Sequence, residues 1–451
     1  MGGLLALSVS LIASAPTELS ANPFFVGRFD GLLGGPLDDR PFALYWNPAR
    51  LDREGVALDL HLGVISRQGS YDRVPDPDST AEEAAVNGGL ATTSALGALP
   101  SLAAQWGQRL SGAWRLGLGG GVYIARAGTA DWDRHPDAPS EYPGAYDGPQ
   151  RWSALSTSML LLNSALGASV GYGPLSVGVS LNHVRGNLST AKAANADKTD
   201  ELVDPDGNLK EGRIFLDNAT GQGFHVGAGA ALQLDRFELG VSWRQPVIYE
   251  LKGTSYIIFG AQESKANAKI PLQVAGSLMS SLAYQLNDSL RLRVEYERQN
   301  WSIMDQQKIV SLDNGEDLLV LDRQFKDTNA YRLRADYALS EGFRLHAGLS
   351  FEEGTTDEAY HEAGLAEHDQ LEGGLGVTVA LSDKLELHSA FLWQHFFDRV
   401  VTQSAQTPST NGAYTDNRQY LTFDLTWRFG AGAQRSAAAP SEPSQTREEA
   451  P

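Results

Sequence analysis

Very short and long connections alternate along most of this 451-residue chain. The pattern is clearest over residues 270–351, where four amphipathic segments are separated by Asn287-Asp288, by a long acidic stretch and by Ser340-Glu341. Strict alternation places all short turns at one end of an antiparallel sheet and all long loops at the other. Bacterial outer-membrane barrels have this arrangement, with short periplasmic turns and long external loops. The pattern therefore predicts a sheet that closes into a barrel and crosses a membrane.

Fourteen strand-like segments can be counted between Gly55 and Phe429, joined by six short and seven long connections. The short connections are rich in Gly, Asn, Asp and Ser, which favour tight hairpins. An even number suits a single-chain barrel with both ends on the periplasmic side. We predict an all-β fold, a 14-stranded antiparallel transmembrane β-barrel over residues 54–430, with long loops at residues 68–98, 128–152, 189–222, 251–270, 304–327, 356–367 and 399–417.

The side-chain alternation also predicts which face of each strand meets lipid. In the last segment Leu421 and Phe423 alternate with Thr422 and Asp424, and residues 290–297 show the same period. A charge on the lipid-facing side costs about 2–4 kcal/mol at the middle of the membrane. The apolar positions are therefore expected to face lipid, and the charged positions to face the lumen.

Composition excludes several classes of protein. The absence of cysteine rules out disulfide frameworks, thiolate metal sites and cysteine nucleophiles. A net charge of −19 argues against nucleic-acid binding, because no basic surface is available to neutralise phosphates. The nine His residues show no metal-binding spacing, so neither a metal nor another cofactor is predicted. Asp204-x-Asp206-Gly207-Asn208 resembles a calcium loop but lacks the later ligand positions, and it is read first as a turn.

Three segments at the two ends of the chain do not follow the hairpin pattern. Residues 1–21 are apolar and end in small residues, which predicts a signal peptide. Residues 431–451 offer nothing apolar to bury, so a disordered C-terminal tail is expected. Residues 22–53 are irregular but aromatic, which predicts a packed hatch inside the barrel. The aromatic residues of this segment are Phe24, Phe25, Phe29, Phe42, Tyr45 and Trp46.

Four stretches resemble one known family: FALYWNPARL, GFHVGAGAALQLDRFELGVSWRQPVIYELKG, IPLQVAGSLMSSLAYQLNDSLRLRVEYERQNWSIMD and YRLRADYALSEGFRLHAGLSFEEG. The chain is similar in them to the FadL-type outer-membrane transporters of long-chain fatty acids and other hydrophobic compounds, which include the TodX branch for aromatic hydrocarbons. The resemblance implies a monomeric, passive, non-enzymatic carrier in the bacterial outer membrane. Its partners would be a hydrophobic small molecule and membrane lipid.

The resemblance also implies a mechanism. External loops capture the ligand, a deeper lumenal site binds it, and the hatch moves. An inward kink in the third strand then opens a lateral exit. On this chain Asn47, Pro48 and Ala49 would form the hatch tip beside that kink. Gly119, Gly120 and Gly121 are the candidates for the kink, because glycine runs permit bulges and bends. The alternative is that these glycines make room for the hatch.

Ligand-binding residues are harder to assign. A fatty-acid carboxylate needs a cation, and Arg126, Arg185 and Arg298 lie on upper strand segments. Each of them could instead be a wall residue paired with a neighbouring carboxylate. The apolar capture surface is expected in the second long loop, from Trp132, Tyr142 and Tyr146. Trp152 is assigned instead to the aromatic girdle at the membrane interface.

Two other function classes stay open. A barrel lipase or deacylase would carry a Ser-His pair on its wall, and His183, His388 and His395 lie on predicted strands. No local motif links a serine to any of them. A general porin would have an open polar lumen without an aromatic hatch. His361 and His368, which bracket one loop, are read as surface residues. The sequence does not distinguish fatty acids from aromatic hydrocarbons or other lipids as cargo.

Overall fold

The computed structural model describes residues 29–135, 142–259, 262–364 and 368–429. The predicted signal peptide, residues 22–28 of the predicted hatch and the predicted tail lie outside the described residues. No helix within the described ranges is long and apolar enough to cross a membrane.

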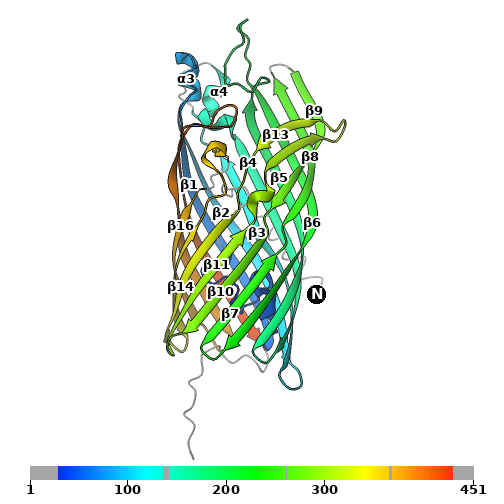
Figure 1. Cartoon of the computed structure of the whole chain (residues 1–451), viewed down its shortest axis with the longest axis vertical. Helices are drawn as coiled ribbons and strands as arrows, with labels where there is room; N and C mark the ends of the chain where they lie inside the picture. Colours follow the sequence, from blue (N-terminus) through cyan, green and yellow to red (C-terminus); the bar gives the residue numbers. More distant parts are fainter. Residues whose placement is uncertain (1–28, 136–141, 260–261, 365–367, 430–451) are drawn as a thin grey trace, which may run out of the picture.

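One antiparallel sheet contains all the strands of the described residues, and β1 pairs with both β2 and β18, which closes the sheet into a barrel (Figure 1). The strands are β1 (Gly55–Arg73), β2 (Gly89–Arg109), β3 (Trp114–Asp131), β4 (Ser156–Tyr172), β5 (Leu175–Ala194), β6 (Gly212–Leu234), β7 (Phe237–Arg244), β8 (Val247–Phe259), β9 (Gln262–Val274), β10 (Ser277–Gln285), β11 (Leu290–Gln299), β12 (Gln306–Ser311), β13 (Asp317–Asp322), β14 (Thr328–Ser340), β15 (Phe343–Glu352), β16 (Gln370–Ala380), β17 (Leu385–Val401) and β18 (Gly412–Phe429).

The wall of the barrel has fourteen strands, as predicted. Strands β7 and β8 form one wall strand, interrupted at Gln245-Pro246, and β9 and β10 form the next, interrupted at Ala275-Gly276. Strands β12 and β13 pair with each other as a hairpin in the loop that follows β11, and β11 pairs directly with β14. Proline lacks a backbone donor and glycine weakens a strand, which explains why the two neighbouring wall strands are interrupted there.

The predicted alternation of connections is confirmed, since the short turns gather at the lower end of Figure 1 and the long loops at the upper end. The strands extend further into the upper end than predicted. The first long loop, for example, spans residues 74–88 rather than 68–98. Hydrophobic alternation fades above the membrane while backbone pairing continues, so the pattern marked the end of the lipid-facing part instead of the end of the strand.

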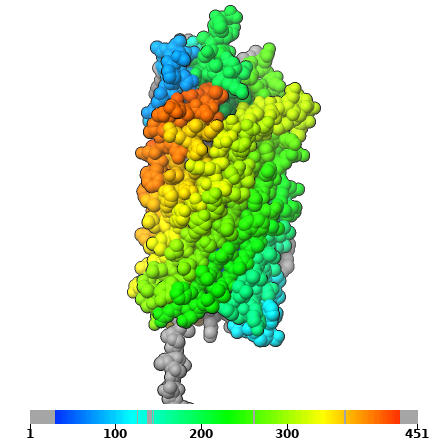
Figure 2. Space-filling view, in the orientation of Figure 1, coloured from blue at the N-terminus to red at the C-terminus, as the bar shows by residue number. Residues whose placement is uncertain are grey.

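Short helices occupy several of the upper loops, and Figure 2 shows loop segments side by side at that end of the molecule. The best-capped of them is α3, where Thr80 and Glu83 form a reciprocal capping box. The helices of the loops are α3 (Ala81–Asn87), α4 (Pro143–Asp147), η2 (Pro149–Trp152), η3 (Trp301–Ile303) and η4 (Glu358–Tyr360).

The predicted faces are confirmed strand by strand. On β18, Leu421 and Phe423 are exposed on the outside, whereas Thr422 and Asp424 are buried inside. On β11, Val294 is exposed, while its neighbours are buried toward the lumen. The lumenal face is therefore polar and charged over much of its length, and these charges need partners inside the barrel.

Those partners come partly from residues 29–53, which lie inside the barrel and contact strands all around its wall. The segment contains α2 (Ala43–Trp46) and η1 (Pro48–Asp52), and it appears in dark blue in the lower half of Figure 1. Arg334 on β14 donates a hydrogen bond to the carbonyl of Leu32. The wall fits the segment closely, because a Cβ on Gly178 of β5 would lie 2.4 Å from the carbonyl carbon of Pro48.

Candidate functional site

A cavity lies in the lumen directly above α2. Its floor is aromatic and its walls come from the strands between β3 and β14. The aromatic residues pack edge to face, with the rings of Phe29 and Tyr45 5.0 Å apart and those of Tyr45 and Trp46 4.8 Å apart. The lining residues are Phe29, Tyr45, Trp46, Arg126, Leu161, Asn163, Val184, His225, Arg244, Gln245, Val247, Tyr249, Val274, Ala275, Ser277, Glu297, Gln299 and Arg332.

Three guanidinium groups and one carboxylate line this cavity. The guanidinium of Arg244 lies 4.0 Å above the ring of Tyr45 and 3.7 Å from the carboxylate of Glu297. Arg332 pairs with the same carboxylate at 2.9 Å. Arg126 lies over the ring of Trp301, 5.2 Å from its centre. The cavity therefore combines apolar surface with an excess of positive charge, which is the chemistry that binds an amphipathic anion.

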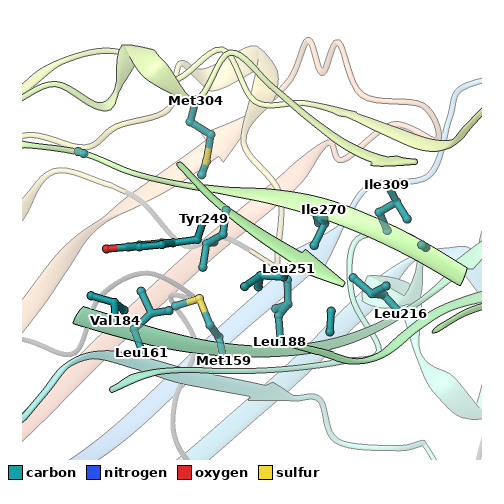
Figure 3. Packing of buried hydrophobic residues seen from close by; sticks show 14 of the residues in the cluster. Met159, Leu161, Val184, Leu188, Leu216, Tyr249, Leu251, Ile270, Met304 and Ile309 are labelled. Carbon is teal, nitrogen blue, oxygen red and sulfur yellow. The ribbon is translucent and has the colours of Figure 1, made fainter. Parts of the chain in front are cut away.

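Above the cavity an apolar cluster fills the upper lumen (Figure 3). Leu161, Val184 and Tyr249 belong to both the cavity lining and the cluster, so the two are continuous. In Figure 3, Met304 extends toward Tyr249 from the loop that follows β11. The buried members of the cluster are Met159, Leu161, Val184, Leu188, Leu216, Ala219, Tyr249, Leu251, Ala268, Ile270, Leu272, Ala275, Trp301, Met304, Ile309 and Phe325.

The loop between β11 and β14 contributes to this cluster, which the sequence pattern did not indicate. Residues 304–327 are expected to form a long external loop, yet Met304, Ile309 and Phe325, together with Trp301 just before them, are buried in the cluster. Their signal was present as apolar residues spaced through polar surroundings. It was outweighed by the acidic residues between them, which face solvent.

The barrel wall is interrupted beside this cavity, between β2 and β3. Their ladder runs from Arg109↔Arg115 only to Leu102↔Val122. Higher up, a single bridge between Thr93 and Trp132 joins them again. Between these points the structure records no ladder pairs for β2 residues 94–101 with β3, although both strands and their outer partners are described. We call this interruption the β2–β3 gap.

The gap is lined by apolar side chains on the lumenal side. Leu99, Ile124 and Ala127 belong there to one apolar cluster with Leu32 of residues 29–53, the inner segment of the barrel. The register of β3 on β4 shifts between Ile124 and Arg126, so the irregularity in β3 coincides with the gap. Arg126 thus belongs both to the gap and to the cavity lining. An apolar opening in the wall adjoins the candidate binding site.

The kink predicted at Gly119, Gly120 and Gly121 does not coincide with the register shift of β3, which lies between Ile124 and Arg126. Gly119, Gly120 and Gly121 pair regularly with β2 and with β4. A Cβ on Gly119 would lie 2.8 Å from the side chain of Leu51 of η1. At this position the alternative interpretation fits better, since the glycine makes room for the inner segment. The register shift begins just above the glycine run.

The recorded contacts of Asn47, Pro48 and Ala49 with the described part of the wall lie on β5 and β6. The side-chain amide of Asn47 donates to the carbonyls of Pro36 and Ala230, at 2.9 and 3.1 Å. Its carbonyl oxygen accepts from the backbone N–H of Ala49 and caps η1. The triplet is therefore a buried anchor on the wall. Leu51 lies against the glycines of β3. The rings of Phe29 and Tyr45 contact Tyr123 of β3, with ring centres 5.5 and 5.4 Å from its own.

Of the three predicted arginines, only Arg126 lines the cavity. Arg185 follows Val184, which faces the cavity, so Arg185 points outward and is exposed. Arg298 alternates with the buried Glu297 and is paired on the outside with Asp327 at 3.1 Å. Arg185 and Arg298 therefore do not line the lumenal cavity.

The predicted loop aromatics do not form one capture surface. Trp132 is buried with Tyr71 and Tyr414 beneath the loops, and Tyr142 packs on a small cluster around Val86. Tyr146 is exposed.

Trp152, predicted in the interfacial girdle, is instead buried in η2. Its indole N–H donates to the side chain of Asn87 at 3.1 Å. That prediction is wrong, because a girdle residue faces lipid, whereas this indole is buried and hydrogen-bonded within the protein.

His361 and His368 are buried, which contradicts their interpretation as surface residues. Their rings lie 4.3 Å apart beneath the loop between β15 and β16. Burial lowers the pKa of His368 to about 4, and burial followed by the neighbouring His368 lowers the pKa of His361 well below its usual range. The pair is held neutral in the upper cap of the barrel.

The three histidines considered for a hydrolase have other partners. The recorded side-chain hydrogen bonds of His183, His388 and His395 within the described ranges go to Gln222, Thr378 and Asn417, and none goes to a serine.

The possible calcium loop forms a hairpin tip. One carboxylate oxygen of Asp204 accepts the backbone N–H groups of Asp206 and Asn208, at 2.9 and 2.8 Å, as in an ordinary turn.

Comparisons with known proteins agree with this architecture. The profile of a family described as outer membrane protein transport protein (OMPP1/FadL/TodX) matches residues 153–429. A search of curated proteins gave no match. A solved FadL homologue of Pseudomonas aeruginosa superposes with a TM-score of 0.69 at 16% identity, covering 92% of this chain and 99% of that chain.

Two toluene transporters share the same fold. TodX of P. putida gives a TM-score of 0.64 at 17% identity and covers 88% of this chain and 99% of its own. TbuX of Ralstonia pickettii gives 0.62 at 18% identity and covers 89% of this chain and 100% of its own.

Proposed function

The chain belongs to the outer membrane protein transport family (OMPP1/FadL/TodX), an outer-membrane family of transporters of hydrophobic compounds, and on this premise we propose that its cargo is an amphipathic molecule with an apolar body and a carboxylate. The resemblance noted in the sequence is thereby confirmed. The apolar cluster would accept the body of the cargo, and Arg126 with Arg244 would accept the carboxylate. A neutral aromatic hydrocarbon fits the aromatic floor but makes no use of the arginines.

The route proceeds from the upper lumen to the cavity and then sideways through the β2–β3 gap into the outer leaflet. Each methylene exposed to water costs about 0.8 kcal/mol, so a path that keeps the cargo against apolar side chains is favoured over an aqueous one. Leu99, Ile124 and Ala127 supply such side chains at the gap. Residues 29–53 act as the hatch, because they close the lumen below the cavity and contact Tyr123 at the lower end of the gap.

The observation that carries this proposal is the missing β2–β3 pairing beside the cavity. Unpaired backbone is costly inside a membrane, and lipid-exposed strand edges do not otherwise occur there. Two neighbouring strands that lack ladder pairs beside the cavity therefore suggest a built-in opening, crossed by a hydrogen bond of 3.4 Å from the backbone N–H of Ile124 to Oγ of Ser101.

A cross-link across the gap tests this route. Because the chain has no cysteine, Leu99→Cys and Ala127→Cys can be joined selectively by a reducible bis-maleimide linker. We expect uptake of a labelled long-chain fatty acid to fall when the linker is present and to recover after reduction. The matched control joins Ser158→Cys to Ser189→Cys, ladder partners in the intact β4–β5 wall. Undiminished uptake through a fully cross-linked gap would overturn the lateral route.

A further inference from the structure

A buried ionic cluster lies between the hatch and the seam where β1 meets β18 and closes the barrel. The hatch and the seam both contribute to it, and every side chain in the cluster is at most 5% exposed. Its members are Asp30, Asp38 and Arg40 from the hatch, Asp59 and His61 from β1, and Asp424 from β18. We call it the seam cluster. It plays no part in the transport route described above.

Negative charge exceeds positive charge in the seam cluster. Four carboxylates share the guanidinium of Arg40 and the imidazole of His61, and no other cation in the described residues forms a recorded ion pair with them. Arg40 pairs closely with Asp30 and Asp38, but it lies 3.5 and 3.6 Å from the carboxylates of Asp424 and Asp59. With His61 protonated and all four carboxylates ionised, two negative charges would remain buried without compensation, and this is strongly unfavourable in a dry interior.

Several carboxylate oxygens in the cluster also lack hydrogen-bond partners. They are Oδ1 of Asp30, both oxygens of Asp59 and Oδ2 of Asp424, all of them buried. Buried polar atoms are nearly always satisfied, so each exception calls for an explanation. A group that accepts electron pairs would satisfy both the unbonded oxygens and the excess charge.

The geometry matches a metal ion. One ligand atom each from Asp30, His61 and Asp424 can be chosen so that all lie within 4.8 Å of one another. His61 Nδ1 lies 3.9 Å from Oδ1 of Asp30 and 2.7 Å from Oδ1 of Asp424, the distance of a hydrogen bond. A cation at about 2.0–2.2 Å from each ligand would take the place of the proton in that hydrogen bond and move the two atoms apart by a few tenths of an ångström. The edges of the Phe29 and Phe42 rings pack against the imidazole, with centres at 5.4 and 5.9 Å, and hold its orientation.

We propose that Asp30, His61 and Asp424 bind one divalent cation of the Zn²⁺ or Mn²⁺ type. Its two positive charges would balance the carboxylates of Asp30 and Asp424, since a metal-bound imidazole is neutral. An imidazole nitrogen among carboxylate oxygens favours these ions over Ca²⁺, which takes oxygen ligands. Asp30 belongs to the hatch, whereas His61 and Asp424 belong to the wall. The ion therefore ties the hatch to the closing seam of the barrel, and the hatch cannot leave the wall at this point without losing a metal ligand.

The test measures metal binding directly and does not depend on transport or on the identity of the cargo. Full-length protein in detergent is stripped with EDTA, dialysed, and titrated with ZnCl₂ or MnCl₂ by calorimetry, and bound metal is counted by mass spectrometry. We expect one cation per chain. Asp424→Asn and His61→Gln should each weaken binding about 100-fold or more, since losing even an outer-shell partner costs about 10–100-fold.

Asp416→Asn is the matched control. Asp416 is also a buried carboxylate on β18, but its recorded ion pairs within the described residues are with Arg67 and Arg418 and not with a histidine. This variant should keep the cation stoichiometry of the parent. Asp30→Asn provides a third ligand variant if one of the others fails to fold, as judged by heat-modifiable gel mobility. Absence of binding by the parent at millimolar metal, or equal binding by all variants, would overturn the proposal. Protons shared among the carboxyl groups would then neutralise the excess negative charge of the seam cluster.

Discussion

The two halves of the lumen differ in how they fill the same barrel. The upper half is apolar, with Leu251 and Met304 buried at its centre under the loop that follows β11. The lower half is ionic, with Arg40 of the hatch surrounded by carboxylates. Apolar packing is non-directional and can adapt to a guest, whereas a buried ion network requires fixed partners. The upper half is therefore suited to receive cargo, and the lower half to hold the hatch.

Loss of the Arg40 guanidinium should have the largest effect, because it isolates the lower carboxylates. We expect Arg40→Met to lower the free energy of unfolding by about 3–5 kcal/mol and to raise ion conductance in planar bilayers as the hatch loosens. The control is Arg109→Met, whose exposed pair with Glu54 contributes only about 0–1 kcal/mol. Equal stability of the two variants would mean that charge does not hold the hatch.

Truncation in the upper half tests whether its apolar packing is equally specific. Leu251→Ala removes a fully buried side chain from the cluster and should cost about 2–5 kcal/mol in urea unfolding in micelles. Ion conductance should stay low, because the hatch contacts are untouched. Leu166→Ala, on the lipid-facing surface, is the matched control and should cost less. An increase in ion conductance in Leu251→Ala would contradict the claim that only the lower half of the lumen holds the hatch.

The boundary between the halves is the cavity, and Arg126 tests its selectivity. Arg126→Met should weaken binding of a long-chain fatty acid about tenfold or more, because a hydrogen bond to a charged group contributes about 1.5–3 kcal/mol. Binding of the corresponding methyl ester should change little, since it carries no charge. Arg298→Met, on the outer surface, should bind both ligands as the parent does. Equal losses for acid and ester would show that Arg126 supports packing only.

The smallest effect should come from protonating the two buried histidines of the upper cap at low pH. His361 and His368 are neutral in the folded cap, and the pKa of His368 is held near 4 by burial. An opened loop takes up protons near pH 6.5, so the closed form loses stability as the pH falls from about 6.5 toward 4, by about 1–2 kcal/mol at pH 5.

Hydrogen exchange of residues 353–364, corrected for the intrinsic rate, should therefore increase at pH 5. His368→Gln keeps a neutral polar side chain and should reduce that increase. Pronounced protection at pH 5 in the parent would mean that the cap does not depend on the neutral pair.

Much of the fold could be predicted because its determinants are local. The alternation of Leu421 and Phe423 with Thr422 and Asp424 assigns the two faces of β18, since lipid excludes charge. The site could be predicted only in part. Of the three candidate arginines, Arg126 lines the cavity, whereas Arg185 and Arg298 point outward, as the alternation of their own strands requires. On β3 the register shifts beside Arg126, and a short stretch of sequence does not reveal such a shift.

The barrel, its orientation and its family could all be predicted from the sequence, because strand period and loop alternation depend on neighbouring residues. Which lumenal residues meet follows from the three-dimensional fold alone. Asp30, His61 and Asp424 are brought together because the first and last strands pair to close the barrel around the hatch. The β2–β3 gap likewise depends on pairing between two whole strands. Contacts of this kind are set by closure of the barrel, and no local pattern encodes them.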